Sequence, residues 1–375
     1  MCPAGHEGPL IRLRRGIIRE IGAVNPGQAG SVELAVDVEG ARALALAYPA
    51  LVGAVRVGDT VVLNTTAVEL GLGTGGFHLV VAVEGGADTD VEHPGRVMKA
   101  RYTPMQVAVR TVEETHRERI ESSRGLANVP VVCAPLHSMV AAIAAGAKAS
   151  GDARVVYVMT DGAALAGGFS RLVPRMRELG LLEGWISCGQ AFGGELEAAT
   201  LWTGLLAARE ILDAEVIVVA DGPGNLGTDT TWGVSALASG HALMAARALK
   251  GRPVAALRMS FADPRERHRV VSHHSLTILR DVCKVDVNVA VPVLDDAQRD
   301  VVWDALRAAR LEETHQLVEA DGRPALAELQ RRGLEVTSMG RSPVEDPAFF
   351  LAAGAAGVLA GRMAASSRSY RDLRR

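Results

Sequence analysis

Three histidines close together in the chain are the strongest candidates for chemistry. His268, His273 and His274 lie within seven residues, with Asp263 just upstream. Imidazoles titrate near neutral pH and also bind divalent metals. His273 and His274 are therefore predicted to act as acid or base, with His268 and His273 as metal ligands in the alternative. If this segment is extended, the adjacent pair points to opposite sides. A polar loop that contacts water or a second subunit explains the same pattern, and the sequence leaves the choice open.

A glycine-rich segment is the second candidate. The pattern Gly222-x-Gly224-x-x-Gly227 follows a predicted strand, and the backbone N–H groups of such turns bind anions. Asn225 and Thr228 are expected to orient the anion. A dinucleotide is disfavoured as the ligand, because the next helix begins several residues after the glycines. In addition, no acidic residue ends the following strand, where a ribose would need one.

Polar residues also follow the other predicted strands. The carboxyl ends of parallel strands meet at one edge of a sheet, and ligands usually bind at that edge. Asp161 is predicted to partner a histidine or a metal ion there. Such loops also cap helices, which favours polar residues without any ligand. The other residues predicted to bind the ligand are His137, Ser138, Gln190, Gly193 and Glu195.

The elements that must position these residues fall into two parts. Residues 10–100 show short apolar runs of period two separated by glycine, proline and asparagine, which predicts a small β-barrel whose closure removes exposed edges. Residues 101–127 form a charged connecting segment. In residues 128–365, apolar strand-length runs alternate with helical stretches, which predicts a three-layer α/β domain with a doubly wound, mostly parallel, Rossmann-like sheet.

Four details of this second part can be tested directly. A helix is predicted over Glu195–Leu212, with Glu195 and Glu197 in its first turn, where the helix dipole favours acids. The other three predicted elements are a helix over Arg299–Val318, a last strand at Leu334–Ser338 and a closing helix over Pro347–Ala365. Small residues from Leu351 to Ala364 can pack against a second copy of the chain, so a homo-oligomer, preferably a dimer, is expected.

Composition excludes several classes of protein. The 375 residues carry a formal net charge of −3, and aromatic residues make up only 4%, so nucleic acid is not an expected partner. Four cysteines stand far apart without a CxxC pair, which disfavours a structural zinc site or a disulfide framework. Met1–Pro9 lacks an apolar signal core, and the apolar stretch Phe349–Ala360 is too short to span a membrane. A cytoplasmic protein without a membrane partner is expected.

The chain also contains a characteristic series of motifs. These are Ala47–Gly53, Leu63–Thr66, Leu70–Gly76, Lys99–Pro104, Tyr157–Gly162, Gly189–Glu197, Gly222–Gly227, Val271–Ser275 and Asp346–Phe350. In this combination the sequence resembles a bacterial family known as domain of unknown function 3866, from about Ile11 to Arg362. The resemblance implies a bacterial, cytoplasmic protein and supplies no activity, cofactor or catalytic residue.

These observations lead to one main functional hypothesis and one alternative. The main hypothesis is an enzyme that acts on a small anionic molecule, such as a phosphorylated one, by histidine acid/base or divalent-metal chemistry at the carboxyl edge of the parallel sheet. The alternative is a non-catalytic protein whose same edge binds a metabolite or another subunit.

Overall fold

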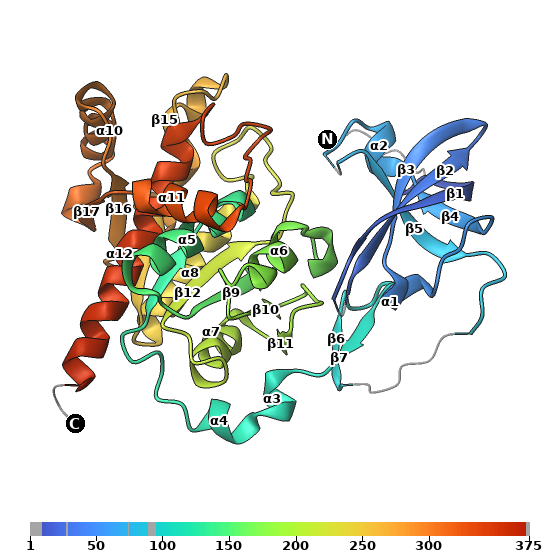
Figure 1. Cartoon of the computed structure of the whole chain (residues 1–375), viewed down its shortest axis with the longest axis horizontal. Helices are drawn as coiled ribbons and strands as arrows, with labels where there is room; N and C mark the ends of the chain where they lie inside the picture. Colours follow the sequence, from blue (N-terminus) through green and yellow to red (C-terminus); the bar gives the residue numbers. More distant parts are fainter. Residues whose placement is uncertain (1–9, 28, 74, 89–94, 373–375) are drawn as a thin grey trace, which may run out of the picture. The chain divides into compact units, whose positions relative to one another are not determined.

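The structure is a computed structural model that describes residues 10–27, 29–73, 75–88 and 95–372 (Figure 1). The chain divides into two compact units, residues 1–93 and 94–375. The segment Met1–Pro9, in which the sequence shows no signal core, lies outside the described residues.

The first unit is the predicted closed barrel, with strand order β1-β2-β3-β5-β4. The long strand β1 pairs antiparallel with both β2 and β4, and a parallel pairing of β3 with β5 completes the ring. Alternate residues point inward, so Ile18, Val36 and Leu63 are fully buried in its core. The elements of this unit are β1 (Leu13–Asn25), β2 (Ser31–Val38), β3 (Ala41–Ala47), α1 (Pro49–Val52), β4 (Thr60–Asn64), α2 (Thr66–Glu69) and β5 (Phe77–Val83).

The second unit is built on an eight-stranded sheet in the order β11-β10-β9-β12-β8-β13-β16-β17. Every pairing in it is parallel, which confirms the predicted fold class. Apart from the edge strand at Gln316–Ala320, the strands are short, mostly apolar and buried on both faces, as a parallel sheet requires. Their bounds are β8 (Pro130–Cys133), β9 (Val155–Thr160), β10 (Gly184–Cys188), β11 (Leu196–Ala198), β12 (Val216–Asp221), β13 (Arg252–Ala256), β16 (Asn288–Pro292) and β17 (Gln316–Ala320).

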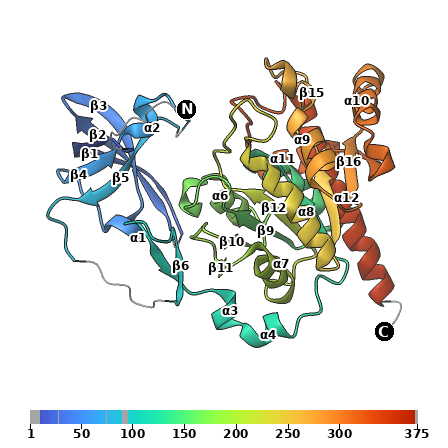
Figure 2. The same cartoon turned by 180° about the vertical axis from the view of Figure 1, so that it is seen from behind.

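Helices cover both faces of this sheet. One apolar core joins it to α5 (Val140–Gly151), α6 (Leu172–Glu178), α11 (Arg323–Arg332) and α12 (Pro347–Asp372). The other core joins it to α7 (Leu201–Glu210), α8 (Ala238–Ala248) and α10 (Asp296–Ala308). Figure 1 shows α5 and α12 in front of the sheet, and Figure 2 shows α7 and α8 in front. The remaining elements are β6 (Val97–Lys99), β7 (Val107–Val109), α3 (Val112–Thr115), α4 (Arg117–Glu121), β14 (Met259–Ser260), β15 (Val270–Val271) and α9 (His273–Thr277).

Helices α5 and α12 approach until their backbones touch. A Cβ atom added at Gly357 would lie 2.0 Å from the carbonyl oxygen of Ile143, and one at Gly146 would lie 2.5 Å from that of Gly354. Only glycine fits such a contact. The helix predicted at Pro347–Ala365 therefore exists, and its small residues pack inside the chain. From the sequence, the same residues were expected to contact a second copy of the chain. A dimer stays a prediction, but the glycine-rich surface of this helix is already covered by α5 of the same chain.

Helix α12 is also the longest helix of the protein's described part. Over Pro347–Arg368 it is long and apolar enough to cross a membrane, by length and composition alone. However, 78% of its most apolar window is buried inside the structure. Burial of this extent is what a core helix shows, and it matches the close contact with α5.

The helix predicted to start at Glu195 is wrong at its beginning. Residues Leu196–Ala198 form strand β11, and helix α7 starts only at Leu201, capped by Thr200. The reason is a buried ion pair, because the fully buried Lys99 Nζ donates to Glu197 Oε2 at 2.6 Å. Glu197 also accepts from the Gly193 N–H and the Ser187 hydroxyl. These contacts satisfy a buried carboxylate better than a helix dipole can.

Two predictions near the carboxyl terminus are also wrong. The helix predicted to run to Val318 ends at Ala308, and Gln316–Ala320 instead pairs with β16 as the edge strand. The strand predicted at Leu334–Ser338 has no sheet partner among the described residues. Its side chains nevertheless alternate between buried and exposed. An extended segment lying on a core has the same period as a strand, so the sequence pattern could not separate the two.

The glycine contact between α5 and α12 gives the first prediction. Gly357→Ala should lower the free energy of unfolding by about 2–3 kcal/mol, because the new methyl group forces the two helices apart. Urea unfolding followed by far-ultraviolet circular dichroism measures this change. Ser366→Ala, at an exposed position of the same helix, is the control and should change it by less than about 0.5 kcal/mol. An equally small effect of Gly357→Ala would contradict the contact.

Candidate functional site

A pocket lies at the carboxyl ends of the three central strands β8, β12 and β13. Helix α5 leaves β8 on one face of the sheet and α8 follows β12 on the other, so the loops diverge and leave a crevice. Its volume is about 400 Å³, enough for a small metabolite. Its lining residues are Pro135, Leu136, His137, Ser138, Pro223, Gly224, Asn225, Leu226, Gly227, Asp229, Val234, Ala236, Arg258, Arg265, Arg267, His268, His274, Ser338 and Met339.

The glycine-rich loop after β12 forms one wall of the pocket. Gly224 has φ +90°, a conformation that favours glycine. The Asn225 side-chain amide donates to the Pro135 carbonyl, the Asp221 carboxylate and the Ser235 hydroxyl at 3.2–3.3 Å. Asn225 therefore fastens the loop. Among the described residues, none accepts a hydrogen bond from the backbone N–H of Gly224 or Gly227.

His137 forms part of the adjacent wall, and both of its ring nitrogens are engaged. Its Nδ1 lies 3.2 Å from the Tyr157 hydroxyl, and its Nε2 lies 2.9 Å from the Ser170 hydroxyl. Tyr157 donates its own proton to the Asp221 carbonyl, so His137 carries its proton on Nδ1. Burial lowers the pKa of His137 to about 4. The ring is neutral at pH 7, and its two hydrogen bonds fix its position in the pocket wall.

A buried carboxylate organises the arginines of the opposite wall. Asp263 accepts two hydrogen bonds from the Arg265 guanidinium and lies 3.5–3.6 Å from those of Arg258 and Arg341. The hydrogen bonds from Arg265 hold the pKa of Asp263 well below its usual range. Arg341 also pairs with Asp346. Three guanidinium groups thus share two carboxylates, which leaves one positive charge in excess.

Arg258 is the least satisfied member of this group. It is only 8% exposed, and among the described residues its guanidinium has no hydrogen-bond acceptor, since the ion pair with Asp263 spans 3.6 Å. Burial and the neighbouring arginines lower its pKa to about 10, so it stays charged at neutral pH. A buried, charged fork that lines a pocket without an acceptor is suited to bind an anion.

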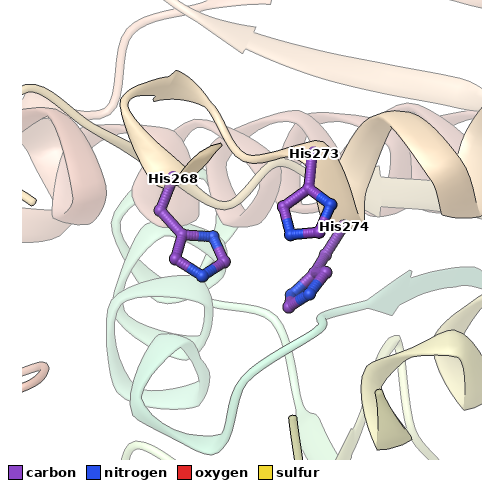
Figure 3. A group of neighbouring side chains, drawn as sticks. All are labelled: His268, His273 and His274. Carbon is purple, nitrogen blue, oxygen red and sulfur yellow. The ribbon is translucent and has the colours of Figure 1, made fainter. Parts of the chain in front are cut away.

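The three predicted histidines meet beside these arginines (Figure 3). His268 ends the 3-10 turn Glu266–His268, whereas His273 and His274 begin helix α9. One nitrogen of each ring lies within 4.8 Å of the others. Because the adjacent pair is helical and not extended, its ring centroids lie 4.1 Å apart. The two rings therefore do not point to opposite sides, as they would in an extended segment.

All three imidazoles are neutral at pH 7. Burial lowers the pKa of His268 to about 3 and that of His274 to about 4, with contributions from nearby arginines. Burial also lowers the pKa of His273. Neutral imidazoles can accept a proton or bind a metal ion, so the cluster suits either kind of chemistry.

Several predicted site residues lie away from the pocket lining. Asp161 accepts a hydrogen bond from the backbone N–H of Gln190 at 2.7 Å and has no contact with the histidines among the described interactions. Glu195 pairs with Arg177, and the Gly193 N–H donates to Glu197. Two more lie at the ends of the glycine-rich loop. Gly222 packs against Ala164 and Met159, and Thr228 bonds to Thr230 and Gly233.

Sequence reasoning missed the arginines that line the pocket. Strand β13 ends at Ala256, so Arg258 leaves the sheet at its carboxyl edge. The available signal was a charged residue inside an otherwise apolar run. Arg265 and Arg267 lie in the same segment as the histidines, so their position in the sequence could have suggested them as site residues. Arg267 pairs with Asp229, which lies beyond the glycines, and this contact joins the two walls.

Comparison with known proteins gives a family match. Residues 44–357 match the family described as protein of unknown function (DUF3866). No curated protein and no solved structure matches the chain.

The buried His137 predicts a pH dependence of stability. Its pKa is about 4 in the folded protein and about 6.5 in the unfolded chain. The unfolded chain therefore binds an extra proton between these values, and stability falls as the pH drops through this window. The loss from pH 7 to pH 5 amounts to about 2 kcal/mol for this group.

Urea unfolding of the protein and of His137→Gln at pH 7 and pH 5 tests this assignment. The variant should lose about 2 kcal/mol less stability between the two pH values, whatever its stability at pH 7. His241→Gln, which changes an exposed histidine, should leave the difference unaltered. The assignment is wrong if His137→Gln shows the same pH dependence as the parent protein.

Proposed function

The chain belongs to the DUF3866 family, and from the pocket itself we propose that it is an enzyme acting on a small anionic molecule, with a phosphate group as the simplest case. The proposal rests on one observation above the others. The buried Arg258, which lacks a hydrogen-bond acceptor among the described residues, lines the same pocket as the neutral imidazoles of His268 and His274.

Two kinds of donor support an anion in this pocket. The Arg258 guanidinium offers a planar pair of N–H groups that matches two oxygens of a phosphate. Gly224 and Gly227 also line the pocket, and among the described residues their backbone N–H groups have no hydrogen-bond acceptor. Because Asp263 and Asp346 do not balance all the neighbouring guanidinium charge, the pocket favours a negatively charged ligand. The size of the pocket limits that ligand to a small molecule.

The imidazoles favour catalysis over binding alone. A protein that only binds an anion needs positive charge and N–H donors, and Arg258 with the loop already supplies both. Three neutral imidazoles add no charge, and burying them costs free energy unless their nitrogens are used. Beyond hydrogen bonding, proton transfer and metal ligation are the two uses that such nitrogens have.

The anion site gives a direct prediction. Arg258→Gln should weaken binding of inorganic sulfate, a stable mimic of a phosphate dianion, on the order of 10- to 100-fold, because a charged hydrogen bond contributes about 1.5–3 kcal/mol. Isothermal titration calorimetry in a chloride buffer with a metal chelator measures the affinity. Arg258→Lys, which keeps the charge but not the fork, should lie between the two.

Arg299→Gln is the matched control, since Arg299 lies on the exposed side of α10, away from the pocket lining. It should bind sulfate like the parent protein. Thermal unfolding without sulfate shows whether the Arg258 variants are folded. The anion site is wrong if folded Arg258→Gln binds sulfate as tightly as the parent protein, or if the parent protein does not bind it.

A further inference from the structure

We infer that His268, His273 and His274 together bind one divalent metal ion, with an open coordination position that faces the pocket. The inference starts from their geometry, since one nitrogen of each ring lies within 4.8 Å of the other two. Figure 3 shows the three rings converging from two separate segments of the chain. His268 and His274 line the pocket, so an ion held between them reaches the ligand.

The hydrogen bonds of His268 leave Nε2 as the ring nitrogen that can bind a metal ion. Arg267 Nε donates to His268 Nε2 at 3.4 Å, so Nε2 carries the lone pair and Nδ1 the proton. His268 Nδ1 then donates to the Ser272 hydroxyl oxygen at 2.9 Å. Metal-binding histidines commonly donate their second nitrogen to an oxygen in this way, which fixes the ring and makes the ligand nitrogen more basic. Ser272 also caps α9 through the His274 N–H, so one hydroxyl holds both segments.

One ring nitrogen of His273 makes no hydrogen bond in the metal-free protein. His273 Nε2 is buried and has no hydrogen-bond partner. An unsatisfied buried polar atom costs free energy, and in a folded protein it commonly marks an absent ligand or ion. A metal ion in the cluster supplies that partner.

The distances allow such an ion after small side-chain rotations. Zinc–nitrogen bonds are about 2.0–2.1 Å long, which places two tetrahedral ligands about 3.4 Å apart. The observed upper limit of 4.8 Å therefore has to shrink by about 1.4 Å at most. Rotations about the Cα–Cβ and Cβ–Cγ bonds of the three side chains are the movements that supply this change.

The ligand set identifies the class of metal. Three neutral imidazoles without a carboxylate suit zinc or cobalt, whereas magnesium and calcium prefer oxygen ligands. Three protein ligands also leave the fourth tetrahedral position open, as in catalytic zinc sites. The lowered pKa values of the histidines agree with this assignment, because no proton has to leave before the metal binds at pH 7.

The surrounding charge sets a condition on metal binding. Arg258 and Arg267 both lower the pKa values of the cluster histidines, so the potential there is positive and opposes a dication. An anion at Arg258 offsets that repulsion and can occupy the open position. Metal and anion should therefore strengthen each other's binding, an expectation that rests on the proposed function.

Arg267 is also a direct competitor of the metal, because its guanidinium contacts the lone pair of His268 Nε2. It is held there by Asp229 from the glycine-rich loop. Removing the guanidinium takes away a positive charge and frees the Asp229 carboxylate. Both changes favour a dication.

Titration of the chelator-treated protein with Co²⁺ and Zn²⁺ tests the inference. Calorimetry should give one ion per chain, and bound Co²⁺ should show the intense visible bands of tetrahedral coordination. His268→Ala, His273→Ala and His274→Ala should each weaken binding on the order of 100-fold, whereas the exposed His241→Ala should not. Arg267→Gln should strengthen it by about tenfold, with Arg269→Gln on the exposed side of the same loop as its control.

Sulfate then tests the coupling, because its zinc and cobalt salts are soluble. Sulfate should tighten Co²⁺ binding, and Co²⁺ should tighten sulfate binding by the same factor, as linkage requires. The metal site is overturned if no ion binds stoichiometrically, or if binding survives the three histidine variants. Loss of sulfate binding in Arg258→Gln under chelator would still support the anion site, so failure of the metal site and failure of the proposed function give different results.

Discussion

Asp263 is the group on which the pocket depends. Its carboxylate is almost completely buried and faces the guanidinium groups of Arg258, Arg265 and Arg341. Three cations crowded together in a low-dielectric interior repel one another by several kcal/mol unless an anion lies between them. Asp263 meets that requirement only in part, because its two oxygens are hydrogen-bonded to Arg265. The residual charge falls on Arg258, and the affinity of the pocket for an anion follows from this imbalance.

The order of the strands explains why the relevant loops meet. Strand β8 begins the sheet of the second unit and comes to lie between β12 and β13, which follow it at 80 residues or more in the chain. The loops after these three strands carry His137, the glycines and Arg258, respectively. A parallel sheet places all three loop entrances at one edge, and helices that leave to opposite faces keep the space between them open. The chemistry is therefore assembled by non-local pairing, and no continuous stretch of sequence contains it.

The sequence predicted the architecture well because each part has its own period. Alternation of period two indicated the barrel, and uninterrupted apolar runs indicated the buried parallel strands. The errors arose where one tertiary contact decided the local structure: the Lys99 ion pair draws Glu197 into a strand, and the apolar surface beneath Leu334–Ser338 imposes a strand-like period without pairing. In the site, residue type and spacing found the glycines and the histidines. For Arg258 the only signal was a charge inside an apolar run, and that signal was weak because only four of 40 basic residues are lysines and arginine is common throughout.

The contact between α5 and α12 has a mechanical consequence. Side chains between two helices can change rotamers and let the helices slide, but glycine backbones in direct contact have no such freedom. The two helices are therefore expected to move together as one rigid unit. Helix α12 begins next to Asp346, which bonds to Ser260 and Arg341 beside the pocket, and its 26 residues extend about 39 Å from there. A displacement at the pocket rim would therefore be passed along α12 to its carboxyl end, as along a lever.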